Sequence, residues 1–165
     1  MREYKHLVHT VSFRVLKNRE DAQEATQDAF VKAFQCLGSF QGGSKLSTWL
    51  YSIAYRTALS KLRTRRKGAI TLEELPESTI MQQGEDRGEI TDRRLALDTA
   101  LAELPIEDAT VVTLFYLHQQ NIEEIVTITG LTASNVKVKL HRSRKRMHAT
   151  LEVLLKDELW TIRGN

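Results

Sequence analysis

Apolar residues recur at intervals of three and four along most of the chain, which is the spacing of helices that bury one face. Prolines, which would interrupt such helices, number only 2 in 165 residues. The pattern therefore predicts an all-α protein. Helices are expected over residues 4–16, 19–37 and 44–67, and again over 95–104 and 106–118.

The same spacing predicts which side chains of the first three helices form a core. In the first helix the apolar stripe consists of Tyr4, Leu7, Val8, Val11, Val15 and Leu16. In the second helix the residues expected to be buried are Ala22, Ala25, Ala29, Phe30, Ala33, Phe34 and Leu37. In the third helix the inward face comprises Leu46, Trp49, Leu50, Ile53, Ala54 and Thr57, while Tyr51, Tyr55, Arg56, Leu59 and Arg63 point elsewhere.

Helical spacing weakens over residues 68–96, where several glycines and Pro76 punctuate a polar and acidic stretch. Such a composition is typical of a flexible linker. We therefore expect two small helical domains, over residues 1–67 and 97–160, joined by an acidic linker over 68–96.

The second domain contains a short capped helix, a turn and a longer helix. Asn121 is expected to cap the short helix, with Glu124 at the reciprocal position of a capping box. Gly130 readily adopts the left-handed backbone that ends a helix, and Thr132 then caps the next one. The sequence thus predicts a helix-turn-helix, a motif whose second helix enters the major groove of DNA.

The second helix of this motif has an apolar face and a polar face. The residues expected to face the core are Val136, Leu140, Met147, Leu151 and Leu154. The residues expected to face DNA are Ser134, Asn135, Lys137, Val138, Lys139, His141, Arg142 and Lys145. Short polar, cationic and methyl-bearing side chains suit the major groove, where arginine binds guanine and apolar groups contact thymine methyls.

The distribution of charge also points to a polyanionic partner. The net charge is only +3, but cations gather near the end of the third helix and again over 137–148, with an acidic stretch between them. Tyrosines and arginines interleave on the third helix beside the polar loop 41–47, a pattern typical of surfaces that stack single-stranded bases. The sequence therefore favours two separate contacts with nucleic acid.

Other classes of site find little support in the sequence. Cys36 is the only cysteine, which excludes an internal disulfide, and a small core position is expected for it. The 5 histidines form no ligand set, and no catalytic triad or phosphate-binding loop is recognisable, so we expect no metal, no cofactor and no enzymatic activity. No apolar run reaches the roughly 20 residues of a membrane span, and a cytoplasmic protein is expected.

A single helix-turn-helix contacts too few bases for high specificity, so the protein needs a second contact or a partner. The residues alone leave three classes open. One is a two-domain DNA-binding factor that works on a larger partner. The second is a conventional regulator that binds duplex DNA as a dimer, and the third is a helical adaptor whose basic faces are merely solvated.

Two parts of the chain resemble the extracytoplasmic-function sigma factors of bacterial RNA polymerase. Region 2 of that family is similar to segments 20–30 and 47–54, which read EDAQEATQDAF and STWLYSIA, and to Phe40 between them. Region 4 is similar to Leu101-x-x-Leu104-Pro105, Glu124-Ile125, Gly130-Leu131 and segment 136–144, which reads VKVKLHRSR. The matches cover nearly the whole chain in the order of the family. Arg56 stands where the family usually has asparagine.

The resemblance implies a transcription initiation factor that brings core RNA polymerase to promoter DNA, with an anti-sigma factor as a further partner. The second helix would present to the polymerase clamp Asp21, Glu24, Gln27, Asp28 and Val31. The opened minus-ten element would be held by Phe40, Ser44, Lys45, Ser47, Trp49, Tyr51, Tyr55, Arg56, Ser60 and Arg63. The helix-turn-helix would bind the minus-thirty-five element as duplex.

Overall fold

The computed structural model describes residues 2–69 and 90–155, and all regular structure in these two stretches is helical. The first stretch contains α1 (Arg2–Leu16), α2 (Arg19–Cys36), the 3-10 turn η1 (Leu37–Ser39) and α3 (Leu46–Ala69). The second contains α4 (Ile90–Ala102), α5 (Ile106–Val112), the π-helical turn η2 (Thr113–Leu117), α6 (Ile122–Thr129) and α7 (Ala133–Leu154). The all-α prediction is confirmed. Most of the predicted linker, residues 70–89, lies outside the described residues.

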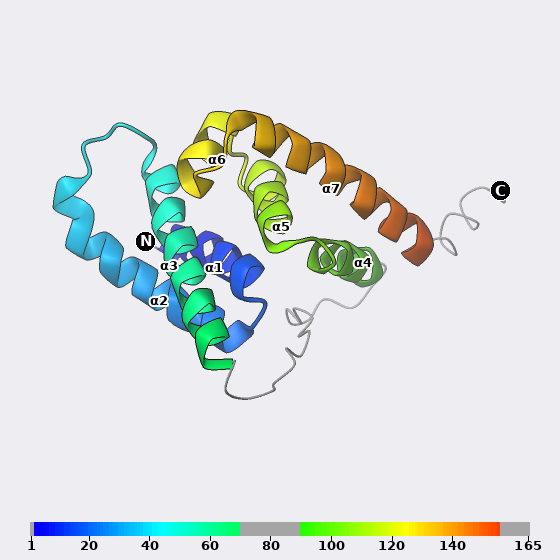
Figure 1. Cartoon of the computed structure of the whole chain (residues 1–165), viewed down its shortest axis with the longest axis horizontal. Coiled ribbons are helices and arrows are strands. Elements are labelled where there is room, and N and C mark those ends of the chain that lie inside the picture. The colour runs from blue at the N-terminus through cyan, green and yellow to red at the C-terminus, as the bar shows by residue number, and fades with distance from the viewer. Residues whose placement is uncertain (1, 70–89, 156–165) are drawn as a thin grey trace.

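Helices α1, α2 and α3 pack on one another as a first helical domain (Figure 1). The predicted stripe of α1 is confirmed, since Val8, Val11 and Val15 are inaccessible to solvent. α2 turns toward the core mainly small side chains, namely Ala22, Ala25, Ala29 and Ala33. Because the distance between packed helices depends on the side chains at the contact, an alanine face lets α2 lie close to its neighbours.

The predicted faces of α2 and α3 are wrong at several large residues. Phe34 and Leu37, which were expected in the core, are 57% and 50% exposed, and Leu46 is 43% exposed. These residues lie near the ends of their helices, where the three-helix core no longer reaches them. Tyr51 and Tyr55, which were expected to point away from the core, are only 2% and 3% exposed.

The two tyrosines are covered by the second domain, which follows them by more than 30 positions in the sequence. The ring of Tyr51 lies 5.2 Å from the ring of His118, between their centroids. Tyr55 lies close enough to Glu107 and Lys139 for their charges to act on its pKa. The helical periodicity of the third helix does not show that a second domain will bury these two side chains. Cys36, expected in a small core position, is likewise exposed.

Helices α4 to α7 form a second helical domain, and its inaccessible core includes Leu104, Leu114, Ile125, Ile128 and Val136. α4 begins at Ile90, before the start that the apolar spacing indicated. The predicted helix over 106–118 is α5 followed by η2, and such π-helical turns are rare and often lie at functional contacts. None of the helices that the structure describes combines the length and apolarity needed to cross a bilayer.

The two domains are in contact, with α1 against α5 and α3 against α6 (Figure 1). At one end of this contact, Arg14 forms an ion pair of 3.2 Å with Asp98. Nearby, Nζ of Lys17 donates to the carbonyl oxygens of Ala102 at 2.8 Å and Leu104 at 3.3 Å, at the carboxyl end of α4. These contacts hold the end of α1 against the start of the second domain.

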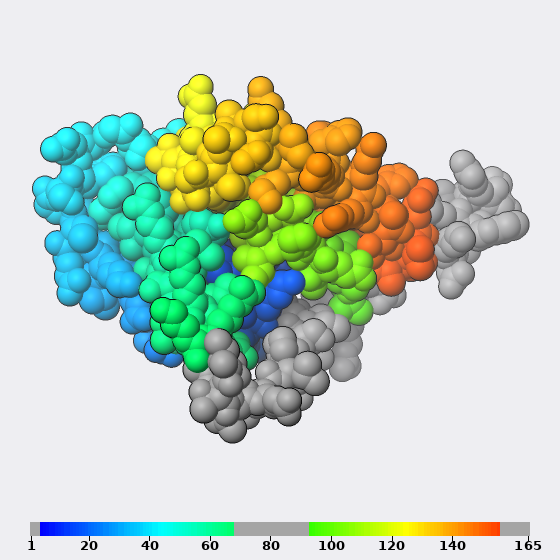
Figure 2. All heavy atoms as spheres, in the orientation of Figure 1, coloured from blue at the N-terminus to red at the C-terminus, as the bar shows by residue number. Residues whose placement is uncertain are grey.

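At the other end of the contact, α3 and the loop before it meet α6. The hydroxyl of Thr48 donates to Oε1 of Gln120 at 3.0 Å, with both residues buried. Nζ of Lys45 lies 2.9 Å from Oε1 of Glu124. In the space-filling view, the atoms of α6 lie directly against those of α3 (Figure 2).

Candidate nucleic-acid interface

The helix-turn-helix forms as its local signals predicted. The side chain of Asn121 accepts from the backbone N–H of Glu124 at 2.9 Å, and the Glu124 carboxylate accepts from the N–H of Asn121 at 2.8 Å. This reciprocal pair satisfies N–H groups that the helix itself leaves unbonded. Gly130 ends α6 in the left-handed conformation, with φ of 76°. Local hydrogen bonds and the left-handed glycine therefore determine the conformation of the turn, without contributions from tertiary packing.

Helix α7 is anchored on the second domain by its first half. Thr132 caps it by accepting from the N–H of Asn135 at 3.2 Å. Val136 is inaccessible and Leu140 is 5% exposed, so the predicted core face is confirmed there, and Ser143, which was not predicted to be buried, is also inaccessible. The prediction is wrong at Leu154, which is 47% exposed near the carboxyl end of the helix.

The opposite face of α7 presents a row of exposed polar, cationic and methyl-bearing side chains. Its members are Ser134, Asn135, Lys137, Val138, His141, Arg142 and Lys145. We call this set the α7 outer face. Val138 is 42% exposed in the middle of cations, which is the mixture expected of a helix that contacts base edges and thymine methyls. The position of the helix after a tight capped turn leaves this face free to enter a major groove.

Lys139 does not belong to the α7 outer face, although the sequence placed it among the DNA contacts. Its Nζ lies 2.9 Å from Oδ1 of Asp108 and 3.0 Å from Oε2 of Glu107, both on α5. Burial alone would lower the pKa of Lys139, but the hydrogen bonds to the two carboxylates raise it overall. An ammonium held by two carboxylates is neutralised within the domain. Lys139 therefore fixes α7 on α5 and is not available to DNA in this arrangement.

The residues predicted to hold opened DNA divide into exposed and covered groups. Lys45, Arg56, Ser60 and Arg63 are exposed, and Phe40, Ser44, Ser47 and Trp49 are partly buried. The rings of Phe40 and Trp49 pack together, with centroids 5.1 Å apart. Tyr51 and Tyr55 are the covered group. Burial, with Tyr4 as a lesser cause, raises the pKa of Tyr51 to about 12, so its phenol is neutral and screened from solvent.

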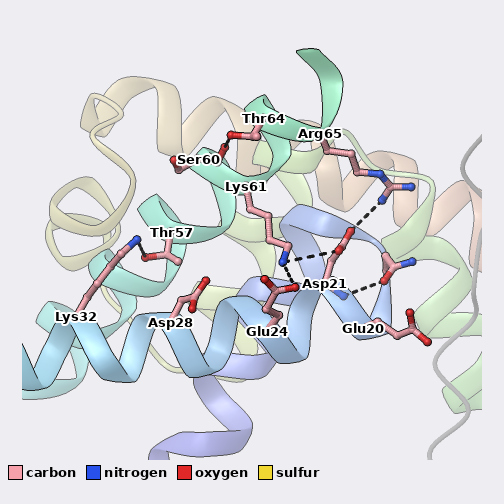
Figure 3. Close-up of a pocket in the computed structure, with 11 residues that line it drawn as sticks. Glu20, Asp21, Glu24, Asp28, Lys32, Thr57, Ser60, Lys61, Thr64 and Arg65 are labelled. Carbon is pink, nitrogen blue, oxygen red and sulfur yellow. Dashed lines mark hydrogen bonds and ion pairs between the residues drawn. The ribbon is translucent and has the colours of Figure 1, made fainter. Parts of the chain in front are cut away.

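The acidic residues of α2 also divide into paired and exposed groups (Figure 3). Arg65 of α3 lies 3.1 Å from Oδ2 of Asp21, and Lys61 contacts the carboxylates of both Asp21 and Glu24. These ion pairs cross a groove of about 680 Å³ between α2 and α3. Glu24 is exposed although it is paired, and Gln27, Asp28 and Val31 are exposed as well, with Val31 55% exposed.

Sequence reasoning missed the cations and polar residues that make these contacts. Lys61 and Arg65 lie among the cations near the end of the third helix, and matching them to the acids of α2 requires knowing that the two helices are antiparallel neighbours. Gln120 and His118 carried no local signal for a contact with the first domain. Within the described residues, no group of three or more metal-ligating side chains comes together.

Comparison with known proteins identifies two family regions in the chain. The family model described as Sigma-70 region 2 matches residues 1–68, and the one described as Sigma-70, region 4 matches residues 94–147. The first match covers α1, α2 and all but the last residue of α3, and the second begins within α4 and extends into α7. The helix-turn-helix therefore lies within the region 4 match.

Similar proteins cover nearly the whole chain. The RNA polymerase sigma factor SigV of Bacillus subtilis is 31% identical over 150 residues, which are 90% of this chain and 87% of that protein. The ECF RNA polymerase sigma factor SigW of the same organism is 27% identical over 161 residues, with 92% and 86% covered. The fold is similar to that of the sigma factor RpoE of Bartonella quintana, solved with the anti-sigma factor NepR, at a TM-score of 0.77 and 21% identity, covering 94% of this chain and 95% of that one. The chain thus belongs to the extracytoplasmic-function sigma factors, the transcription initiation factors that contain sigma regions 2 and 4 and direct RNA polymerase to promoters.

Proposed function

We propose that the protein divides promoter recognition between two domains, residues 1–67 for opened DNA and residues 97–160 for upstream duplex DNA. The observation that carries this proposal is the α7 outer face, a solvent-facing row of polar, cationic and methyl-bearing side chains on a capped helix-turn-helix. A single such helix reads only a few base pairs. The first domain and the polymerase then supply the remaining specificity and affinity.

For the upstream element, Arg142, His141 and Lys137 are the proposed base and phosphate contacts. Arginine can donate two parallel hydrogen bonds to guanine in the major groove. Val138, between these cations, offers an apolar contact of the kind that a thymine methyl makes. Lys139 is left out of this set because α5 already binds its ammonium group.

For the opened element, the proposed surface runs from the loop before α3 along the exposed side of that helix. Lys45, Arg56 and Arg63 supply exposed cations for the phosphates. Phe40 and Trp49 form an aromatic pair beside them, and Tyr51 and Tyr55 would add stacking surfaces once uncovered.

The polymerase would bind the outer side of α2. Carboxylates repel DNA, so exposed acids fit a protein partner better than a nucleic acid. Asp28, Gln27 and Val31 are exposed and lie outside the ion pairs with Lys61 and Arg65, and they form the proposed centre of this surface. Asp21 and Glu24, which are paired with Lys61 and Arg65, would lie at its margin.

Two further assignments follow from the family. RpoE of Bartonella quintana is held by the anti-sigma factor NepR, and we propose that this chain also has an anti-sigma partner. Since bacterial polymerase works in the cytoplasm, we propose the same location for this protein.

Transcription with core polymerase tests whether the two domains bind different parts of the promoter. Run-off transcription on a genomic library would identify a promoter, and permanganate reactivity of unpaired thymines would report strand opening on it. We expect opening only when the protein and core polymerase are both present. Arg56→Ala should reduce opening more than closed-complex binding, whereas Arg142→Ala should reduce both. Tight, sequence-specific duplex binding by the isolated protein as a dimer would contradict the proposal.

A further inference from the structure

The groove between α2 and α3 has walls of opposite charge (Figure 3). Along the α2 wall, Asp21, Glu24 and Asp28 recur at intervals of three and four residues, so they share one face of the helix. Along the α3 wall, Lys61 and Arg65 are one helical turn apart. The groove is therefore acidic on the side of α2 and cationic on the side of α3.

Ion pairs that remain accessible to solvent join the two walls. Lys61 contacts Glu24, whose side chain is 65% exposed. Arg65, whose side chain is 42% exposed, lies 3.1 Å from Oδ2 of Asp21. Exposed pairs of this kind contribute little to stability, because water screens the charges and long side chains lose freedom when they pair. These pairs can therefore be exchanged for other partners at small cost.

Asp28 lies in the same groove without a cation. None of the described lysines and arginines forms an ion pair with it, and Lys32, one turn further along α2, instead donates to the hydroxyl of Thr57 at 3.3 Å. Glu24 lies one turn before Asp28, about 6 Å away on the surface of the helix. A cationic side chain that binds Asp28 therefore arrives next to Glu24, which Lys61 already occupies.

We infer that Lys61 and Arg65 compete with the polymerase for α2: cationic side chains of the polymerase enter the groove and displace these two residues from Glu24 and Asp21. The inference rests on the proposed function, because it assumes that α2 receives the polymerase. A carboxylate that is paired within the domain is not available to the partner. The internal pairs therefore weaken polymerase binding, and polymerase binding weakens the internal pairs by the same factor.

The internal pairs also make binding selective. A partner that places cations against the carboxylates of α2 replaces the pairs that it breaks, whereas an apolar or acidic surface breaks them without replacement. In the free protein, Lys61 and Arg65 cover two of the carboxylates, which reduces the attraction of α2 for the cations of unrelated proteins.

Neutral substitutions on α3 test the competition. Lys61→Gln with Arg65→Gln removes both internal cations and keeps polar side chains at these positions. The matched control is Arg66→Gln with Lys67→Gln, which removes one arginine and one lysine from exposed positions of the same helix outside the groove. A second control, Lys61→Arg with Arg65→Lys, keeps both charges in the groove. Binding of each protein, labelled with a dye at its amino terminus, to core polymerase is measured by anisotropy without DNA.

We expect Lys61→Gln with Arg65→Gln to bind core polymerase about fivefold more tightly than the unsubstituted protein, the factor that corresponds to about 1 kcal/mol for two exposed ion pairs. Both controls should keep the unsubstituted affinity. The affinity of the doubly neutral protein should also fall more steeply with added salt, because its binding forms ion pairs without breaking any. Thermal melting followed by circular dichroism would show that its helices remain folded.

A substitution on the opposite wall provides a second measurement. In the unsubstituted protein, Glu24→Gln removes an internal pair and a polymerase contact together. When Lys61 and Arg65 are already neutral, the same change removes only the polymerase contact. Glu24→Gln should therefore cost more polymerase affinity in the doubly neutral protein than in the unsubstituted one. Losses of equal size would show that Glu24 is not the object of a competition.

The inference is overturned if removing the two cations leaves polymerase affinity unchanged or lowers it. If Asp28→Lys still weakens polymerase binding in that case, α2 remains the polymerase surface and only the internal competition is lost. If neither Asp28→Lys nor Glu24→Gln changes binding, the polymerase does not bind this side of α2. The proposed surface and the competition are then both wrong.

Discussion

Lys139 and Asp108 lie 2.9 Å apart, and their ion pair joins α7 to α5 behind the α7 outer face. Removing the lysine would leave Asp108, which is 6% exposed, without its cation. We expect Lys139→Ala to lower the free energy of unfolding by about 1–3 kcal/mol, the cost of an unsatisfied buried polar group. Denaturant titration measures this loss. Lys137→Ala, two positions away and exposed, should weaken DNA binding without changing stability. Equal stability of the two variants would contradict the positioning role of Lys139.

Arg142 is expected to set specificity at the upstream element. Arg142→Ala should cost about 1–3 kcal/mol on the preferred site, the value of one bidentate base contact. The same change on a site with a substituted base pair at the contacted position should cost much less. Competition binding by the holoenzyme on matched duplexes measures both losses. A uniform loss on every duplex would identify Arg142 as a phosphate contact instead.

Substitutions at Asp28 and Asp21 distinguish an effect on polymerase binding from an effect on the stability of the fold. Asp28 is exposed on α2, whereas Asp21 is paired with Arg65 and Lys61 of α3. Asp28→Lys should weaken copurification with core polymerase at an unchanged melting temperature. Asp21→Lys should lower the melting temperature as well, because it places a cation against two others. Copurification of the Asp28 variant at the level of the unsubstituted protein would show that this part of α2 is not the polymerase surface.

Acidification should loosen the docked domains through His118. Burial, and then the charge of Arg14, lowers the pKa of His118 from 6.5 to about 4, while the ring of Tyr51 faces it from α3. The neutral imidazole is favoured when docked, so docking is most stable above pH 6.5. It should weaken as pH falls from 6.5 toward 4, by up to about 3 kcal/mol. Energy transfer between dyes on the two domains would follow this change.

His118→Gln provides the control for that pH dependence. Glutamine does not titrate, so the variant should lose much less energy transfer across the same pH window. Protonation of the Glu124 carboxylate, which pairs with Lys45 at the contact, affects both proteins alike. Indistinguishable pH profiles would show that the carboxylates, and not His118, govern docking.

The sequence predicted well those features that neighbouring residues determine. The capping box of Asn121 with Glu124, the left-handed Gly130 and the cap at Thr132 are all local, and all were confirmed. Predictions failed where a distant segment decides burial. Tyr51 and Tyr55 are covered by the second domain, and Lys139 is bound by carboxylates of another helix. Helical periodicity identifies a polar or apolar face, but it does not identify what will lie against that face.

Helix α2 packs on the core through a row of alanines on one side and presents its other side to partners. Ala22, Ala25, Ala29 and Ala33 sit against close neighbours, where even a valine would add volume to a packed contact. The outer positions of the same helix contribute little to this core, so substitutions there alter charge and shape at modest cost in stability. Selection can therefore adjust the surface that this helix offers to partners while the backbone beneath it stays in place. On these grounds substitutions on the outer side of α2 should change partner binding with little loss of stability, and substitutions on the inner side should lower stability.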